Sequence, residues 1–259
     1  MTDDVLENGY GPDVPAGDTL LRDYVESGVR YLVDVGRAVG APTIEDDALG
    51  GAHHGAPFPF ANLTYARRPL DATEWTDAIA RLRAVYPAGP PFVIVSPFPT
   101  ADLAPLGFTL VGHPPFMVRP SGAATVPAPE GVTIERVTTA EGLAEFEATL
   151  IEAYPGGPGG TFFTPGILDV DGVALWVARL DGACVATAAG HHGGAVNGVE
   201  IISALPSVRG RRIGEAITWA PTLARPDLPA ALFASDPGRP VYERMGYLPV
   251  LRFTLWIGA

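Results

Sequence analysis

The chain passes from a β-forming run into a predicted helix through the loop Ala204-Leu-Pro-Ser-Val-Arg-Gly-Arg-Arg-Ile-Gly-Glu-Ala-Ile-Thr218. Main-chain N–H groups of this loop would lie at a helix N-terminus, which attracts anions. Gly210 and Gly214 would let the backbone approach phosphate oxygens closely. Three arginines would add charged donors: Arg209, Arg211 and Arg212. The loop therefore predicts a site for a compact polyphosphate, and the alternative is a solvated basic turn that opens a surface helix.

Two common phosphate-binding motifs are absent from the chain, namely GxxxxGKS/T and GxGxxG. The loop instead resembles the acetyl-CoA-binding signature of the GNAT superfamily of N-acetyltransferases, in which Gln or Arg is followed by x-x-Gly-x and then Gly or Ala. In one register Arg209 and Gly214 take the first and last positions, and Arg212 replaces the middle glycine. A second register, Arg211-x-x-Gly214-x-Ala216, fits every letter but begins two residues later after Pro206. We prefer the first register because it keeps the family's usual approach from strand to loop.

A second segment supports the resemblance independently. Ser235-Asp-Pro-Gly-Arg-Pro-Val-Tyr242-Glu-Arg-Met-Gly246-Tyr247 is similar to the closing strand, short helix and tyrosine-to-glycine ending of the same family. The resemblance covers roughly residues 131–259. It implies an α/β (α+β) fold with a mixed, largely antiparallel sheet, flanked by helices and splayed between two central strands. Pantetheine would then insert like an additional strand.

The resemblance implies direct transfer of an acetyl or other acyl group from CoA to an amine, with acetyl-CoA as co-substrate. Main-chain groups of Ala204 and Leu205 would pair with pantetheine, and the loop amides would hold the pyrophosphate. The full set of implied cofactor-binding residues is Ala204, Leu205, Arg209, Gly210, Arg211, Arg212, Ile213, Gly214, Glu215 and Ser235.

Two residues are the candidates for catalysis. The resemblance places Tyr242 where family members have a tyrosine that protonates the leaving thiolate, although a helix-face aromatic packed on the sheet is the alternative. Glu200 precedes Ala204 by four residues, so in a regular strand both point to one face and Glu200 could be the general base. A solvent-facing carboxylate is the alternative for Glu200. The neighbouring pair His191-His192 could also act as a base, but a glycine-rich hairpin tip predicts that these histidines are exposed.

For residues 1–120 we predict either a second, degenerate GNAT-like domain or an accessory α/β domain. Leu106-Gly107-Phe108 echoes Met245-Gly246-Tyr247, and a linker, 121–130, separates this half from a GNAT domain at 131–259. A capping box, Asp71 with Glu74, predicts the start of one helix. The other elements expected here are a helix over 18–40 with Asp18 as N-cap, a Gly/His loop over 50–55, and strands near 61–67, 91–96, 108–111 and 116–119.

The second half predicts an alternation of strands and helices. Leu180-Asp181-Gly182 should form a hairpin turn between strands 172–179 and 183–190. Thr138 with Glu141 predicts a capping box for a helix that stops at Pro155. The remaining expected elements are strands at 132–137, 199–205, 230–235 and 250–256 and helices at 213–224 and 239–245.

Composition limits the classes of partner. The 259 residues carry 29 acidic and 17 basic side chains, all 17 of them arginine, for a net charge of −12, which disfavours nucleic acid and anionic membranes. The single cysteine, Cys184, excludes an intramolecular disulfide, and His53-His54 lacks a spaced third ligand, so we expect no metal.

An acidic N-terminus without an apolar run predicts a cytoplasmic protein. We expect a small-molecule or peptide amine as acceptor. A homodimer is a possible assembly, because exposed sheet edges can pair with those of a second copy. The alternative function is a non-catalytic CoA-binding or ligand-sensing module with the same fold.

Overall fold

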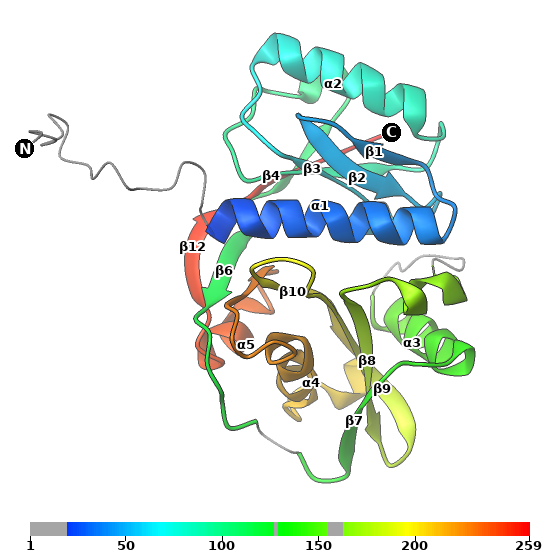
Figure 1. The fold of residues 1–259 in the computed structure, drawn as a ribbon, viewed down its shortest axis with the longest axis vertical. Coiled ribbons are helices and arrows are strands. Elements are labelled where there is room, and N and C mark those ends of the chain that lie inside the picture. Colours follow the sequence, from blue (N-terminus) through cyan, green and yellow to red (C-terminus); the bar gives the residue numbers. More distant parts are fainter. Residues whose placement is uncertain (1–19, 127–128, 155–162) are drawn as a thin grey trace, which may run out of the picture.

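The computed structural model describes residues 20–126, 129–154 and 163–259. It has two halves, each a sheet flanked by helices, with one long helix lying between them (Figure 1). The predicted N-cap Asp18 and the predicted helix stop at Pro155 lie outside the described residues. No helix within the described ranges is long and apolar enough to cross a membrane.

The first half follows its predicted order except between residues 40 and 61, where two strands, 43–45 and 49–53, were not predicted. Asp71 caps its second helix as expected, because its Oδ1 accepts hydrogen bonds from the N–H groups of Thr73 and Glu74 at 2.8 and 2.9 Å. The elements are α1 (Leu20–Ala38), β1 (Thr43–Glu45), β2 (Leu49–His53), β3 (Asn62–Ala66), α2 (Ala72–Val85), β4 (Phe92–Ser96), β5 (Thr109–Gly112) and β6 (Pro115–Arg119).

One of these two strands covers residues 50–53 of the Gly/His segment, for which the prediction of a loop was wrong. Residues 49–53 form the buried strand β2, on which α1 packs. A Cβ at Gly50 would lie 2.3 Å from a methyl group of Val29 on α1, and one at Gly51 would lie 2.1 Å from the carbonyl oxygen of Leu63. These glycines therefore serve close packing of a helix and a neighbouring strand rather than a turn.

The second half also matches the predicted order. Asp181 and Gly182 form the predicted hairpin turn with φ values of 51° and 86°. The predicted capping box of Thr138 with Glu141 does not form, because the N-cap is Thr139, whose hydroxyl accepts from Gly142 N–H at 3.1 Å, and a glycine at this position has no side chain to return the bond. The elements are β7 (Val132–Arg136), α3 (Ala140–Ala153), β8 (Val173–Leu180), β9 (Ala183–His191), β10 (Asn197–Ala204), α4 (Ile213–Thr222), β11 (Ala230–Phe233), α5 (Arg239–Arg244), β12 (Leu248–Arg252) and β13 (Thr254–Gly258).

The two halves repeat one topology, as the sequence echo predicted. In the first half, α1 precedes the antiparallel strands β1, β2 and β3, and α2 leads to β4, which is parallel to β3. In the second half, α3 precedes β8, β9 and β10, and α4 leads to the parallel strand β11. The second half adds β7 at its sheet edge. Both sheets are mixed and largely antiparallel, in agreement with the predicted fold class.

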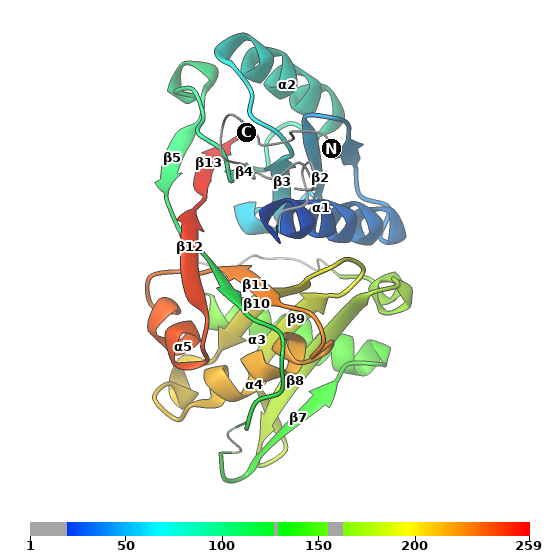
Figure 2. The same cartoon turned by 60° about the vertical axis from the view of Figure 1, so that its left-hand side comes forward.

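The halves exchange their last strands. One sheet has the order β1-β2-β3-β4-β13-β5 and the other β12-β6-β11-β10-β9-β8-β7, so β13 lies in the first sheet and β6 in the second. Figure 2 shows β12 and β13 running from one half into the other. The predicted single strand at 250–256 is thus two strands, separated at the buried Phe253, whose ring stacks on Phe116 at 5.0 Å. Sheet membership therefore does not divide at the predicted linker, 121–130.

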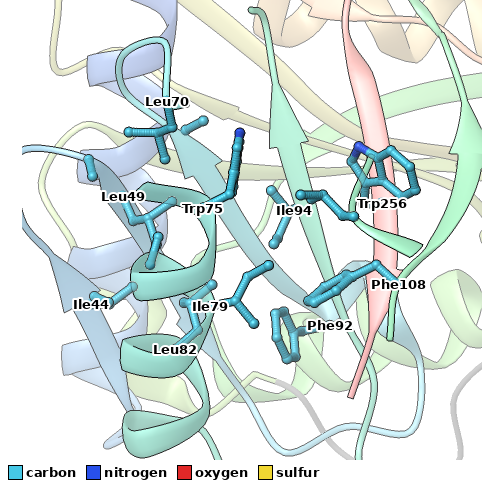
Figure 3. Close-up of a cluster of buried hydrophobic side chains, with 14 of the residues drawn as sticks. Ile44, Leu49, Leu70, Trp75, Ile79, Leu82, Phe92, Ile94, Phe108 and Trp256 are labelled. Carbon is cyan, nitrogen blue, oxygen red and sulfur yellow. The ribbon is translucent and has the colours of Figure 1, made fainter. Parts of the chain in front are cut away.

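The hydrophobic cores confirm that the halves fold together. Trp256 of β13 completes a cluster formed by α2 and the first sheet, alongside Phe108, Phe92 and Ile94 (Figure 3). A second cluster joins α1 to both sheets and consists of Tyr24, Val25, Val29, Leu32, Val33, Tyr65, Val93, Val95, Phe116, Val118, Val196, Ala231, Phe253 and Leu255. The helix α1 is consequently a shared core element rather than a surface helix of the first half.

Candidate functional site

The second sheet opens between its two central strands, β10 and β11. They pair in parallel only at Asn197 with Ala230 and at Gly198 with Ala231. Just beyond this point the register of β10 against β9 shifts, and Ile201 adopts a φ of 52°. Left-handed backbone is strained for a β-branched residue, and such strain concentrates at functional sites. The bulge turns β10 away from β11 and leaves a gap in the sheet.

A cavity of about 740 Å³ occupies this gap and extends to the first half. Strand β10 contributes residues 199–202, and β11 with the segment after it contributes residues 232–236. The lining from the first half includes Phe58, Phe60 and Leu63. Three predicted site residues line the cavity: Glu200, Ser235 and Tyr242. The predicted residues at 204, 205 and 209–215 are not part of its lining.

Glu200 lies in a polar cluster rather than on a solvent-facing edge. Its side chain is 15 % exposed, and Oε1 accepts a hydrogen bond from the Tyr24 hydroxyl at 2.8 Å. His191 Nε2 lies 3.4 Å from the same oxygen. Burial, together with the charge of Glu200, raises the pKa of Tyr24 well above its usual value, so Tyr24 remains a donor. The carboxylate is thus held in place while it borders the cavity.

His191 is buried, so the predicted exposure at a hairpin tip was wrong for this residue. It ends strand β9, is 2 % exposed, and has its Nδ1 2.7 Å from the hydroxyl oxygen of Ser27. The ring of Tyr31 stacks on the imidazole at 5.1 Å with an interplanar angle of 16°. The adjacent His192 is partly buried, and burial lowers its pKa to about 4.

The first half supplies three of these polar side chains, which the sequence analysis did not identify. Tyr24, Ser27 and Tyr31 lie on α1 at spacings of three and four residues, so they form one polar stripe on a buried face. This polar stripe on an amphipathic helix was the sequence feature that could have identified these three residues as site residues. The sequence does not reveal which residues they contact, because His191 and Glu200 lie more than 160 residues away along the chain.

Tyr242 of α5 also borders the cavity and is buried. Burial raises the pKa of its hydroxyl, and the nearby groups of Tyr154 and Glu200 act in the same direction. Its ring makes an edge contact with Tyr247 at 6.0 Å. Within the described residues no hydrogen-bond partner is found for its hydroxyl, which is therefore available to a ligand.

The start of α4 presents unsatisfied main-chain donors. Its N-cap is Arg212 with a φ of 60°, and no side chain caps the helix. The first helical hydrogen bond runs from Ala216 N–H to Arg212 C=O at 2.9 Å, so the amides of residues 213–215 precede the helical ladder. A Cβ at Gly210 or Gly214 would meet no atom within 4 Å. This end of the helix is open to an anion.

The three loop arginines are not equivalent. Arg209 and Arg211 are exposed, and neither forms an ion pair with any described residue. Arg212 Nη2 instead lies 2.7 Å from Oε1 of the buried Glu215, whose other oxygen is 3.7 Å from Arg244. The guanidinium groups open to an anion are consequently those of Arg209 and Arg211, whereas Arg212 offers its main chain.

The strand before this loop offers main-chain groups on one side only. Leu205 N–H donates to Val185 C=O at 2.9 Å, so this predicted cofactor contact is already used within the sheet. Because alternate residues direct their main-chain groups to opposite sides, Ala204 faces away from β9 and toward the gap. The exposed Ser235 uses its hydroxyl oxygen to accept from Gly238 N–H at 3.3 Å.

Comparison with solved structures places this geometry in a known fold. A GCN5-related N-acetyltransferase from Kribbella flavida superposes with a TM-score of 0.65 at 23 % identity, over 93 % of this chain and 96 % of its own. The chain has the GNAT fold. A GNAT from Sphaerobacter thermophilus gives a TM-score of 0.53 at 13 % identity, over 91 % of this chain and 92 % of its own.

The same fold occurs in a protein of unknown function. This conserved protein from Staphylococcus epidermidis ATCC 12228 gives a TM-score of 0.56 at 14 % identity, over 84 % of this chain and 93 % of its own. No protein-family model and no curated protein sequence matches the chain. The similarity therefore establishes the GNAT fold and leaves activity to be argued from the site.

The first half repeats the strand pairing of the second half without these site features. Its strands β3 and β4 keep three consecutive pairs in regular register, from Leu63 with Val93 to Tyr65 with Val95. The start of α2 is filled by the carboxylates of Asp71 and Glu74, which accept its free N–H groups. The arginines before it, Arg67 and Arg68, are held in ion pairs with acidic side chains. The N–H groups of Thr73 and Glu74 are therefore already used at this helix start, and two carboxylates there would repel an anion.

His53, His54 and Cys184 do not line the cavity. His53 is buried in β2, and burial lowers the pKa of His54 to about 4. Across the described residues, no group of three or more His, Cys, Asp or Glu side chains is arranged to hold a metal ion. Cys184 is partly buried, and its burial raises the pKa of the thiol.

Proposed function

We propose that the second half binds acetyl-CoA, or a related acyl-CoA, and transfers the acyl group directly to an amine. One observation carries this proposal. Strand β10, which borders the gap in the sheet, leads directly to the uncapped start of α4, and the described part of the first half has neither a gap in its sheet nor an uncapped start of α2. Among the described residues, the second half therefore combines an opening in its sheet with free amides for a polyphosphate.

The residues around the α4 start fit the chemistry of the cofactor. The open amides at 213–215 and the unpaired guanidinium groups of Arg209 and Arg211 would hold the pyrophosphate. Gly210 and Gly214 leave room for its oxygens. The inward-facing main chain of Ala204 would pair with pantetheine in the manner of an added strand. Bound in this way, the cofactor supplies the acyl group as an activated thioester.

The side chains lining the cavity can move the protons that the transfer requires. Glu200 accepts the proton that the attacking amine loses, and the Tyr24 hydroxyl holds its carboxylate in position. The Tyr242 hydroxyl, kept protonated by its raised pKa, donates a proton to the departing thiolate. The products are an amide and free CoA thiol. Access of water to the reacting groups is restricted because the cavity walls are mostly apolar.

The test is thiol release from acetyl-CoA in the presence of a panel of amines, combined with calorimetric titration of acetyl-CoA. We expect binding of acetyl-CoA and amine-dependent release of thiol. Absence of binding would overturn the cofactor assignment, and binding without release by any amine would overturn the catalytic one.

The second result would favour a CoA-binding or ligand-sensing module. One observation supports this second candidate: Arg212 stands where the GNAT signature has a glycine, and Glu215 neutralises its guanidinium group. The phosphate loop thereby loses one of its three cationic side chains. Binding of acetyl-CoA with wild-type stability but without turnover distinguishes a sensor from an enzyme.

A further inference from the structure

The cavity has a wall that the cofactor contacts do not account for. The first half contributes apolar side chains from three separate segments, represented by Phe58 and Phe60, by Leu63 of β3 and by Val111 of β5. Two of these are unusually accessible for large apolar side chains, Phe60 at 37 % and Val111 at 48 % exposure. Exposed apolar side chains that border a cavity of this size indicate a ligand with an apolar body.

This wall is left for the second substrate. The proposed cofactor contacts at 204 and 209–215 lie in the second half and do not line the cavity. The first half, whose own helix start is closed by Asp71, cannot offer a second phosphate site there. An acceptor that reaches Glu200 would consequently lie against side chains of both halves, including Leu150 and Tyr154 of α3.

The charges around the cavity restrict the acceptor further. Glu200 is the charged lining residue with a mostly buried side chain, whereas Asp236, Arg252 and His113 are exposed. A single ammonium group could pair with Glu200. An additional amine or hydroxyl placed against Phe58, Phe60 and Leu63 would have no partner on that wall, which opposes binding there.

We propose that the acceptor is a primary amine carried on an apolar body, either an aromatic ring or a branched alkyl group. The amine meets Glu200, and the apolar body packs on the wall formed by Phe58, Phe60, Leu63 and Val111. This inference rests on the proposed function, because it names the substrate class of the same site. Polyamines, amino sugars and lysine side chains of peptides are excluded as preferred acceptors.

The experiment compares 2-phenylethylamine and isoamylamine with spermidine, glucosamine and a lysine-containing peptide in the thiol-release assay. We expect the two apolar amines to have values of kcat/KM roughly 100-fold higher, as expected when a ring or branched chain is buried. Release that is faster with spermidine, glucosamine or the peptide would overturn the inference and leave the acyltransferase function intact.

Two neighbouring residues provide a matched pair of variants. Val111 and Leu110 are consecutive on β5 and similarly exposed, at 48 % and 44 %, but only Val111 lines the cavity. Val111→Ser should raise the KM for 2-phenylethylamine several-fold and Phe60→Ser about tenfold, whereas Leu110→Ser should leave it unchanged. All three should keep the wild-type Kd for acetyl-CoA. Equal KM values for Val111→Ser and Leu110→Ser would contradict the proposed wall.

Direct binding separates this inference from the catalytic proposal. Calorimetric titration of 2-phenylethylamine in the presence of CoA measures the acceptor site without turnover. Binding that weakens in Phe60→Ser supports the apolar wall even if no thiol is released, in which case only the catalytic proposal fails. No detectable binding of either apolar amine would overturn the inference.

Discussion

Replacing Gly214 by aspartate should stabilise the protein while weakening the binding of acetyl-CoA. Gly214 lies in the first turn of α4, and a Cβ there meets no atom within 4 Å. Removing a helical glycine gains about 0.5–1 kcal/mol, and a carboxylate near a helix N-terminus gains about 0.3–1 kcal/mol. Because aspartate is itself a modest helix former, we expect a net gain of about 1 kcal/mol, or a rise in Tm of about 2–4 °C for a chain of this size.

The same carboxylate would repel the pyrophosphate. Two unit charges about 4 Å apart interact by about 4 kcal/mol near a protein surface, and screening by salt reduces this value. With about 2–3 kcal/mol remaining, the Kd for acetyl-CoA should rise roughly 30- to 150-fold. Stability and affinity should therefore change in opposite directions, which general damage to the helix cannot produce.

The assay pairs thermal unfolding of the free protein with calorimetric titration of acetyl-CoA. Gly214→Ala should keep most of the stability gain with a much smaller loss of affinity, because it adds no charge. Thr73→Asp introduces the same carboxylate at the equivalent position of α2 and should leave the Kd unchanged. Wild-type affinity in Gly214→Asp would refute the assignment of the cofactor to this helix start.

Four further outcomes test the site and the fold. Glu200→Gln should lower kcat about 10²- to 10⁴-fold with little change in the Kd for acetyl-CoA, and a rate near wild type would remove Glu200 as the base. Tyr242→Phe should lower kcat at least about tenfold, since its hydroxyl is the proposed proton donor, and an unchanged rate would exclude that role. Trp256→Ala should cost about 3–5 kcal/mol in urea unfolding, because the indole is buried in the core of the other half, and a loss under 1 kcal/mol would contradict the shared core. Burial lowers the pKa of His54 in the folded state to about 4, below its usual 6.5, so the unfolded chain takes up the proton first and the free energy of unfolding should fall as pH drops from about 6.5 to 4. Urea unfolding at pH 7 and pH 5 should show a smaller fall for His54→Leu than for the wild type. An equal fall in both proteins would assign the effect to other groups.

Local sequence signals predicted much of the fold. The hairpin at Asp181-Gly182 and the capping box at Asp71 depend only on neighbouring residues, so composition and spacing were sufficient. The loop before α4 was also located correctly between β10 and its helix. The helix start is uncapped because the N-cap residue is Arg212, whose side chain does not accept a hydrogen bond from the first amides of α4. Such features need no knowledge of the rest of the chain.

Features that depend on distant partners were missed. The glycines of β2 indicated a loop because the sequence does not reveal that Val29 packs against Gly50 and that β3 lies close to Gly51. His191 was predicted to be exposed for the same reason, since its partners Ser27 and Tyr31 belong to the other half. The proline-rich linker at 121–130 indicated a boundary between two domains. Hydrogen bonding nevertheless places β13, from the end of the chain, in the first sheet. Pairing between strands far apart in sequence leaves no local signal.

The exchange of β6 and β13 also determines the order in which the chain can fold during synthesis. Until residues 254–258 have left the ribosome, β4 lacks its antiparallel neighbour and Trp256 is missing from the core beneath α2. The emerging first half therefore presents an unpaired strand edge, a feature that promotes aggregation and recruits chaperones. A gene split at the linker would yield two fragments that each lack an internal strand. We expect them to recover structure only when produced together.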